Sequence, residues 1–141
     1  MPEREDLKQL SLLGKPQTRL PAAPDRAILE VFPNHRPGRQ YWITLNCPEF
    51  SSLCPVTGQP DCARLEIRYV PAELCVETKS LKFYLASFRN HAAFNEEIVN
   101  RVLDDLISAI QPRELVVRGE FAPRGGIQLT TEAHYPECDA S

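Results

Sequence analysis

Apolar and polar residues alternate most regularly in residues 62–70, CARLEIRYV. Every second position there is apolar, namely Ala63, Leu65, Ile67 and Tyr69. The positions between them carry the charges of Arg64, Glu66 and Arg68. A period of two places one set of side chains on each face of a strand, so this stretch predicts a β-strand with one buried face.

Four other segments have the composition of strands, because they are short, rich in β-branched or aromatic residues and bounded by proline or glycine. They cover residues 26–32, 39–46, 113–121 and 126–135. The sequence APRGG between the last two predicts a hairpin loop. Residues 46–63 hold Pro48, Pro55, Gly58 and Pro60, a density that predicts a loop.

The period of the apolar residues changes in the second half of the chain. Residues 80–88 carry apolar side chains at helical spacing. Residues 92–110 show the longest such pattern, with apolar side chains at Phe94, Ile98, Val102, Leu106 and Ile110. This spacing predicts an α-helix with one apolar stripe, which Pro112 prevents from continuing.

The predicted order of elements is strands, then two helices, then strands. It lacks the regular β-α alternation of a doubly wound fold, so we predict an α+β fold in which two helices pack on one face of an antiparallel sheet. Long edge strands can pair with another copy, which predicts an oligomer joined edge to edge. We expect a flexible N-terminal arm at residues 1–25, a single domain at residues 26–136 and a C-terminal tail at residues 137–141.

Composition narrows the class of protein. The 141 residues are 43% apolar and 25% charged, as in soluble globular proteins. The net charge of −3 argues against a general nucleic-acid binder, which normally has a basic excess. No segment has the roughly 18 consecutive apolar residues of a membrane span, and the charged N-terminus lacks the apolar core of a signal peptide. We therefore expect a cytoplasmic protein whose thiols are reduced.

Three of the five cysteines fall within residues 46–63. The odd number argues against a disulfide framework, and the lack of a CxxC pair argues against zinc, so no metal site is predicted. Cys54 lies in the middle of the expected loop and Asp61 follows it, which suits a reactive thiol with a proton-handling acid. The residues alone leave a Cys54 that is merely buried in the loop equally open. Cys62 and Cys75 are expected to be small core residues.

Two further stretches combine charge with shape. Lys79 and Lys82 share one face at a predicted strand-to-helix junction, where they can hold a phosphate or form an ordinary solvated face. The ordinary interpretation of Glu77 beside them is a surface carboxylate. Glu96 starts the long helix, where an acid complements the helix dipole. Alternatively, its carboxylate accepts the adjacent N–H donors of a guanine-like ring, with Phe94 stacking nearby. The chain has neither a GxGxxG nor a GxxxxGK[ST] motif.

Together these stretches resemble the NADPH-dependent 7-cyano-7-deazaguanine reductases, the nitrile reductases of queuosine biosynthesis, in their short single-module form. The matching pieces are NCPEFSSLCPVTGQPD, ETKSLKFY, SFRNHAAFNEEIVNR and FAPRGG, in family order over roughly residues 40–127. ETKSLKFY resembles the stretch that separates these reductases from other tunnelling-fold proteins, such as GTP cyclohydrolase I. The resemblance implies the tunnelling fold, a homo-oligomeric ring assembled by sheet edges, and active sites between subunits.

The resemblance also implies a reaction. Cys54 would attack the nitrile carbon of 7-cyano-7-deazaguanine and form a covalent thioimide, and Asp61 would donate a proton to the nitrogen. Hydride from two NADPH molecules would then give 7-aminomethyl-7-deazaguanine. No direct contact with nucleic acid or membrane is expected. Two alternatives stay open: an amidinotransferase-like enzyme of the same fold, and a non-catalytic metal-binding module.

Further residue roles come from the same match. The implied substrate contacts are Val76, Glu77, Thr78, Phe94, Asn95 and Glu96. The implied cofactor contacts are Thr78, Lys79, Lys82, Arg124 and Gly125. This chain departs from the family at one position, because Asn95 stands directly before Glu96 where the family usually has histidine. Asparagine forms hydrogen bonds but cannot shuttle a proton, so we expect substrate binding to survive and proton delivery to slow or to use water.

Overall fold

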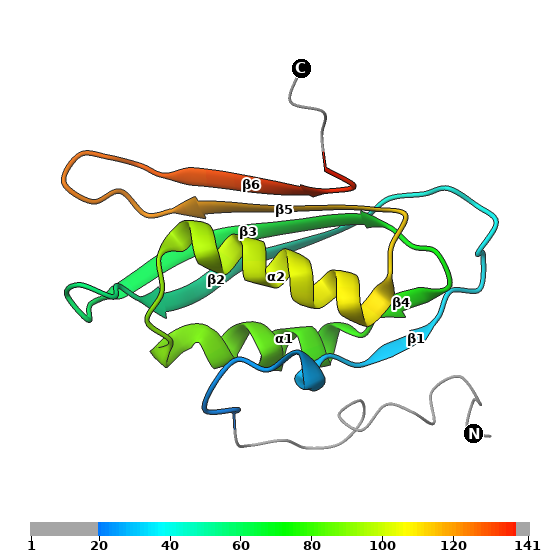
Figure 1. Cartoon of the computed structure of the whole chain (residues 1–141), viewed down its shortest axis with the longest axis horizontal. Helices are drawn as coiled ribbons and strands as arrows, with labels where there is room; N and C mark the ends of the chain where they lie inside the picture. The colour runs from blue at the N-terminus through cyan, green and yellow to red at the C-terminus, as the bar shows by residue number, and fades with distance from the viewer. Residues whose placement is uncertain (1–19, 138–141) are drawn as a thin grey trace.

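The computed structural model describes residues 20–137, so most of the predicted arm and tail lies outside it. Four strands form an antiparallel sheet in the order β2-β3-β5-β6, and two helices cover one of its faces (Figure 1). The strands are β2 (Ile43–Leu53), β3 (Pro60–Val70), β5 (Glu114–Phe121) and β6 (Thr130–Tyr135). The helices are α1 (Thr78–Ala86) and α2 (Asn95–Ile110). The predicted α+β class is confirmed. No helix within residues 20–137 is long and apolar enough to cross a membrane.

A separate two-stranded sheet lies where the chain enters α1. In it, β1 (Val31–Pro33) pairs antiparallel with β4 (Leu74–Val76). The prediction of a strand at residues 26–32 is therefore wrong for most of these residues. Its first residues form a short 3-10 helix, η2 (Arg26–Ile28), because the Asp25 side chain accepts the Ala27 N–H at 2.9 Å and caps it.

The proline-rich stretch at residues 46–63 is mostly strand, and the predicted loop is wrong. Strands β2 and β3 extend into it from either side and leave only residues 54–59 to connect them. β2 is an edge strand, and its register against β3 shifts between Cys47 and Phe50. Pro48 lies at this irregularity, where a missing N–H is tolerated. The reactive-thiol candidate thus sits at the end of a long hairpin.

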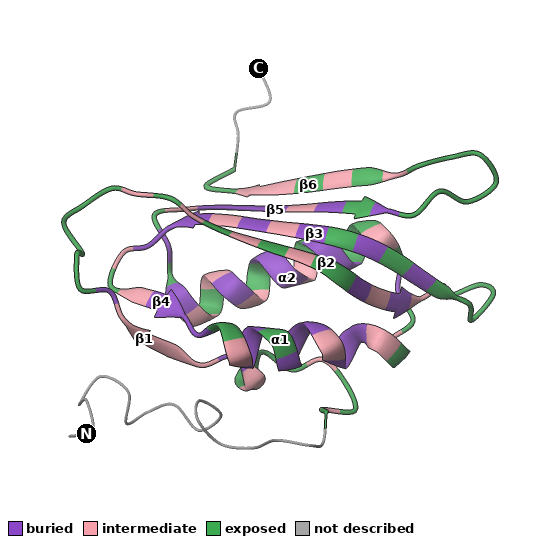
Figure 2. Cartoon of the chain, turned by 180° about the vertical axis from the view of Figure 1, so that it is seen from behind, coloured by how far each residue is buried: buried purple, intermediate pink, exposed green. Residues whose placement is uncertain are grey.

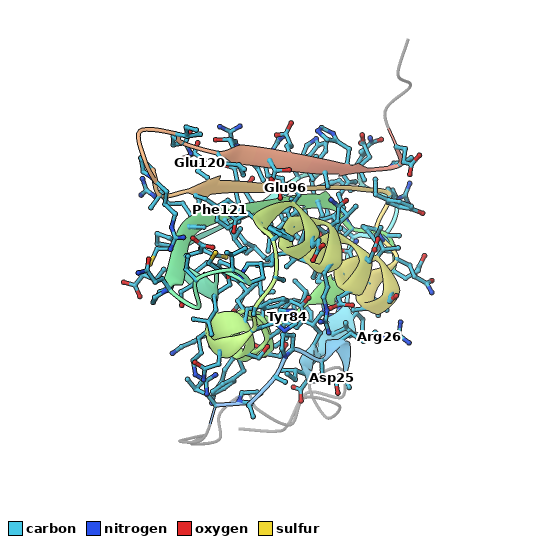
Figure 3. The ribbon with its side chains drawn as sticks, turned by 60° about the vertical axis from the view of Figure 1, so that its left-hand side comes forward. Asp25, Arg26, Tyr84, Glu96, Glu120 and Phe121 are labelled. Carbon is cyan, nitrogen blue, oxygen red and sulfur yellow. The ribbon has the colours of Figure 1, made fainter. Side chains whose placement is uncertain are left out.

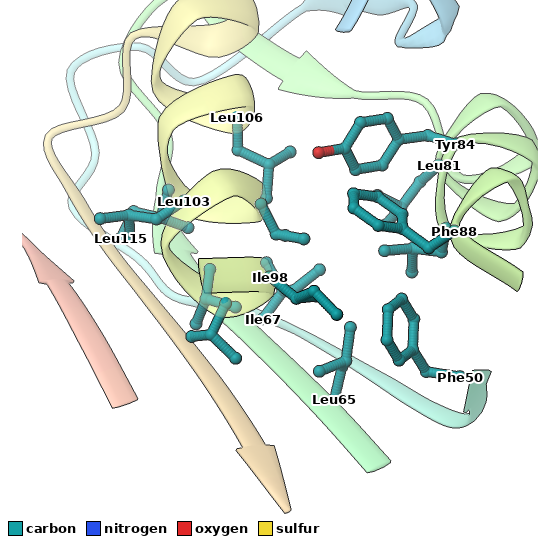
Figure 4. Packing of buried hydrophobic residues seen from close by; sticks show 14 of the residues in the cluster. Phe50, Leu65, Ile67, Leu81, Tyr84, Phe88, Ile98, Leu103, Leu106 and Leu115 are labelled. Carbon is teal, nitrogen blue, oxygen red and sulfur yellow. The ribbon is translucent and has the colours of Figure 1, made fainter. Parts of the chain in front are cut away.

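The apolar core fills the space between the helices and the sheet (Figures 2 and 4). The predicted stripe of α2 is buried from Ile98 to Ile110, and it faces the alternate positions of β3 that the sequence places inward. An aromatic group joins α1 to the end of β2. In it, the ring centroid of Phe88 lies 5.6 Å from that of Phe50 and 5.3 Å from that of Tyr84. This packing fixes where α2 begins relative to the β2–β3 hairpin.

The first member of the predicted stripe is an exception. Phe94 is the N-cap of α2 rather than part of it, and its side chain is 53% exposed. Further along, α2 packs so closely on β5 that a Cβ added at Gly119 would lie 2.9 Å from a side-chain carbon of Val99. The core therefore holds the body of α2 tightly and leaves its first residues facing outward.

Candidate active site

Cys54 lies in the tight turn that connects β2 to β3. Its backbone N–H donates to the Gln59 carbonyl at 2.8 Å, and its carbonyl accepts the Gly58 N–H at 2.9 Å. Gly58 has a φ of 71°, a conformation that glycine adopts without the strain a Cβ would bring. The backbone on both sides of the thiol is therefore fixed.

Three donors surround the sulfur of Cys54. The Thr57 hydroxyl and the backbone N–H groups of Thr57 and Val56 donate to it and lower the pKa of the thiol from 9.0 to about 7. Loss of hydration and the charge of Asp61 act in the opposite direction. Cys54 is partly exposed, unlike the buried loop cysteine considered from the sequence. About half of this thiol is ionised at neutral pH, which makes it a nucleophile.

The other described cysteines differ from Cys54. Cys75 is buried, as predicted. Cys62 is exposed, so its prediction as a core residue is wrong, because its neighbours Asp61 and Ala63 take the inward positions of β3. Burial raises the pKa of both Cys47 and Cys75. Within residues 20–137, no three His, Cys, Asp or Glu side chains are grouped so as to hold a metal ion.

Asp61 lies at the start of β3, close enough to Cys54 for its charge to act on the thiol, and is only 8% exposed. Its Oδ1 is 2.9 Å from Nε of Arg124, and a second nitrogen of Arg124, Nη2, donates to the Pro60 carbonyl at 2.9 Å. Arg124 comes from the β5–β6 connection, where Gly125 has a φ of 56°. The structure thus pairs the predicted proton donor with a residue predicted to bind cofactor.

The start of α2 is joined to the Cys54 turn through the backbone. Leu53, which precedes Cys54, donates its N–H to the His91 carbonyl at 3.0 Å and accepts the Ala93 N–H at 3.2 Å. This short parallel bridge extends the free edge of β2. It places Phe94–Glu96 beside the turn that carries the thiol.

The side chains at the start of α2 differ in exposure. Phe94 and Glu96 are exposed, and Figure 3 shows Glu96 at the start of α2. Asn95 Oδ1 is buried and has no hydrogen-bond partner among residues 20–137. Ser52 Oγ, opposite Asp61 in the sheet, is also buried without a partner in that range. A buried unpaired polar atom costs roughly 1–3 kcal/mol, so two of them near one turn need an explanation, and they lie among the candidate site residues.

The stretch from Val76 to Lys82 forms the junction of β4 and α1. Glu77 is the N-cap of α1: its Oε2 accepts the Lys79 N–H at 2.7 Å and its Oε1 accepts the Ser80 N–H at 2.7 Å. Glu77 is 5% exposed, so the interpretation as a surface carboxylate is wrong. Because its carboxylate takes up these two N–H groups, the positive charge near this helix end comes from lysine side chains instead of free backbone donors.

A groove of about 640 Å³ runs between α1 and β2. Thr78 and Lys82, two of the predicted cofactor contacts, line it from α1. Arg89 lines it from the 3-10 turn Ser87–Asn90 after α1, and Glu49 lines it from β2. Two positively charged side chains and one negatively charged side chain give the lining of the groove a net positive charge. This set of donors fits a ligand that carries phosphate groups.

The predicted site residues therefore fall into two groups, one around the β2–β3 turn and the start of α2, and the other around the β4–α1 junction and along α1 (Figure 1). The Cys54 end, as we call it, holds Cys54, Asp61, Phe94, Asn95, Glu96, Arg124 and Gly125. The α1 end holds Val76, Glu77, Thr78, Lys79 and Lys82. Helix α2 runs between the two ends, and its 16 residues span about 24 Å.

A family model described as "QueF-like protein" matches residues 60–140, which include β3, both helices and the last two strands. The chain belongs to this family. Curated relatives agree with the match and confirm the resemblance to the 7-cyano-7-deazaguanine reductases. A protein of Porphyromonas gingivalis (strain W83) named NADPH-dependent 7-cyano-7-deazaguanine reductase is 52% identical over 133 residues, which cover 94% of this chain and 85% of the relative. A protein of the same name from Bacillus mycoides (strain KBAB4) is 50% identical over 131 residues, 93% of this chain and 79% of the relative.

A solved structure has the same fold. The crystal structure of the archaeosine synthase QueF-Like in the apo form matches this QueF-like chain with a TM-score of 0.62 at 19% identity. The match covers 66% of this chain and 91% of the other. At this identity the likeness concerns the arrangement of helices and strands alone.

Three features of the QueF-like site escaped the sequence reasoning. Thr57 was not singled out, although a hydroxyl three residues after a cysteine in a Gly-containing turn is a usable signal. Ser52 would have required the strand register that pairs it with Asp61. The Arg124–Asp61 ion pair joins two distant segments and has no local signal in the sequence.

Proposed function

We propose that this chain reduces the nitrile of 7-cyano-7-deazaguanine to the aminomethyl group with NADPH, a step of tRNA queuosine biosynthesis in the cytoplasm, and that residues 26–136 form its catalytic domain. The observation that carries the proposal is Cys54, a partly exposed thiol with a pKa of about 7, held beside Asp61 in a QueF-like chain. The relatives that bear this activity by name match the chain over nearly its whole length.

The first step we propose is addition of the Cys54 thiol across the nitrile. The sulfur–carbon bond forms, one carbon–nitrogen π bond breaks, and the nitrogen gains the proton that the thiol gives up. Asp61 is the acid next to the thiol and moves this proton to the nitrogen. The product is a thioimide in which no atom has been oxidised or reduced.

The second step is reduction. When bound, NADPH supplies one hydride to the thioimide carbon and, in a second round, one hydride to the imine left after the Cys54 thiol departs. One further proton reaches the nitrogen in these steps and one returns to the Cys54 sulfur, so that the neutral amine and the free thiol are both formed. Thr78, Lys79 and Lys82, with Arg124 and Gly125 from the other end, would hold the cofactor, and the positive balance of the α1 groove supports the phosphate-binding part of this assignment.

The start of α2 supplies the recognition of the base. Glu96 is exposed in the first turn and would accept the adjacent N–H donors of the guanine-like edge, while the exposed ring of Phe94 stacks on the base. Asn95 lies between them and would contribute hydrogen bonding only. The side chains of Val76 and Glu77 are buried, so we assign the contribution of that stretch to Thr78 and the backbone around it.

A complete site requires two copies of the chain in this proposal. Strand β4, which ends at Val76, lies by the last turn of α2, whereas Phe94–Glu96 lie at its start, and the length of the helix between them exceeds the size of a fused two-ring base. Strands β2 and β6 are the edges of the sheet, and an edge strand can pair with the edge of another copy. A ring of copies joined in this way would bring the Cys54 end of one against the α1 end of its neighbour.

The two-copy site is testable by mixing variants. Cys54→Ala and Lys82→Gln subunits, each defective alone, should regain NADPH oxidation when they are co-assembled, because some interfaces then carry both intact halves. Mixed Cys54→Ala and Asp61→Asn subunits are the control, because both changes lie at the same end. If neither mixture regains activity, each site is built from one chain.

The reaction itself is tested by mixing the protein with 7-cyano-7-deazaguanine. Without NADPH, the intact mass should rise by one substrate per Cys54, and Cys54→Ala should abolish the adduct. With NADPH, two cofactors should be oxidised per amine formed. An adduct without oxidation would favour the amidinotransferase-like alternative, and the lack of both adduct and turnover would exclude nitrile reduction.

A further inference from the structure

Arg124 holds Asp61 from a distant part of the chain. Its Nε lies 2.9 Å from Asp61 Oδ1, and its Nη2 donates to the carbonyl of Pro60, the residue before Asp61. One planar guanidinium therefore grips both the side chain and the adjoining backbone. Two contacts from a rigid fork fix an orientation that a single point charge cannot fix.

The backbone that presents Arg124 is also fixed. Arg124 and Ile127 exchange both backbone hydrogen bonds, with N–O distances of 2.8 and 2.9 Å. Between them, Gly125 and Gly126 adopt positive φ values of 56° and 82°. This tight turn sets the guanidinium against the start of β3 without any ligand.

Burial makes this pairing important for Asp61. The Asp61 side chain is 10% exposed, while that of Arg124 is 43% exposed. A carboxylate that is nearly buried needs a partner, and without one it turns away toward water. Such a movement would disturb an acid that has to lie beside the Cys54 sulfur.

We propose that Arg124 is a positioning residue for Asp61 in the addition of the Cys54 thiol to the nitrile, in addition to any contact with cofactor. This inference rests on the proposed function. Its distinctive consequence is that Arg124 acts in a step in which NADPH takes no part. A residue that only binds cofactor has no effect on that step.

The test measures adduct formation in the absence of NADPH. Full-length protein is mixed with 7-cyano-7-deazaguanine, quenched at intervals and analysed by intact mass. Arg124→Gln should lower the maximal rate constant at least about tenfold and leave the substrate concentration for half-maximal rate nearly unchanged, because orientation and not binding is lost. Arg118→Gln removes an exposed arginine from its 2.8 Å pair with Glu120 and should leave the rate unchanged.

A double-mutant cycle shows whether Arg124 works through Asp61. In an Asp61→Asn background, adding Arg124→Gln should slow adduct formation no further, because the residue that it positions has already lost its function. Arg124→Lys keeps the positive charge, so it is expected to fold even if Arg124→Gln does not. Its rate of adduct formation should lie between those of Arg124→Gln and the wild type, because lysine cannot make both contacts.

The outcomes separate this inference from the proposed function. If the wild-type protein forms no adduct, the proposed function fails. If the wild type forms the adduct and folded Arg124→Gln or Arg124→Lys forms it at the wild-type rate, Arg124 does not position Asp61. The inference is also overturned if Arg124→Gln slows adduct formation by the same factor in the wild type and in the Asp61→Asn background.

Discussion

Replacing Thr57 with valine tests what activates Cys54. Valine keeps the branched shape and removes the hydroxyl, the largest of the contributions that lower the pKa of Cys54 from 9.0 to about 7. The two backbone N–H donors remain. Because the hydroxyl is the largest of three donors, its loss should raise the pKa of Cys54 by roughly one, to about 8. At pH 7 the thiolate fraction then falls from about one half to about one tenth.

The pKa of Cys54 can be followed by its alkylation with iodoacetamide between pH 5 and 10, with peptide mapping to separate it from the other cysteines. The midpoint should move from about 7 to about 8 in Thr57→Val. Adduct formation with the nitrile should slow about fivefold at pH 7, and the defect should disappear near pH 9, where the thiol of both proteins is mostly ionised. Thr57→Ser keeps the hydroxyl and should behave as the wild type. An unmoved midpoint, or a defect that persists at pH 9, would refute the role of Thr57.

Three further predictions concern side chains around the two ends of the molecule. Asn95→His should leave steady-state NADPH oxidation unchanged or raise it, since it restores a residue that can carry a proton; a large loss would show that Asn95 has a role of its own. Glu77→Ala should lower the free energy of unfolding in urea by roughly 1–2 kcal/mol because it removes the cap of α1, whereas Glu97→Ala, at an exposed acid without a capping role, should change it little. Ser52→Ala should not lower the melting temperature, because the hydroxyl it removes is buried and has no partner within residues 20–137; a clear loss of stability would mean that Ser52 is hydrogen-bonded in the protein.

The parts of the fold that the sequence predicts well are those long enough to show a period. Strand β3 and helix α2 each repeat their apolar positions several times, and both follow the prediction closely. Strand β4 has only three residues, too few for any period, so the sequence indicated it only as the strand side of the junction before Lys79, without bounds. The prolines at residues 46–63 were misleading, because an edge strand with a bulge tolerates a residue that an inner strand would not.

The site shows the same division between local and distant signals. Cys54 and Asp61 share one short motif, and both were named from it. The capping role of Glu77 was missed because glutamate is not among the residues that most often cap helices. The partner of Asp61 was also missed, since the contact depends on how the β5–β6 turn approaches the β2–β3 hairpin, which is a property of the assembled sheet.

The separation of the two ends bears on how the proposed reaction is divided. Thiol addition requires a nucleophile, an acid and recognition of the base, and the Cys54 end of one chain holds residues suited to all three. Reduction additionally requires a phosphate-binding surface, and the exposed Lys82 and the partly buried Arg89 supply positive charge to the groove beside α1. Among the predicted cofactor contacts, only Arg124 and Gly125 lie at the Cys54 end. They are therefore the residues that can act both in thiol addition and in reduction. A change at Lys82 should therefore affect reduction alone, and a change at Arg124 should affect both steps, because its guanidinium already holds the acid on which the first step depends.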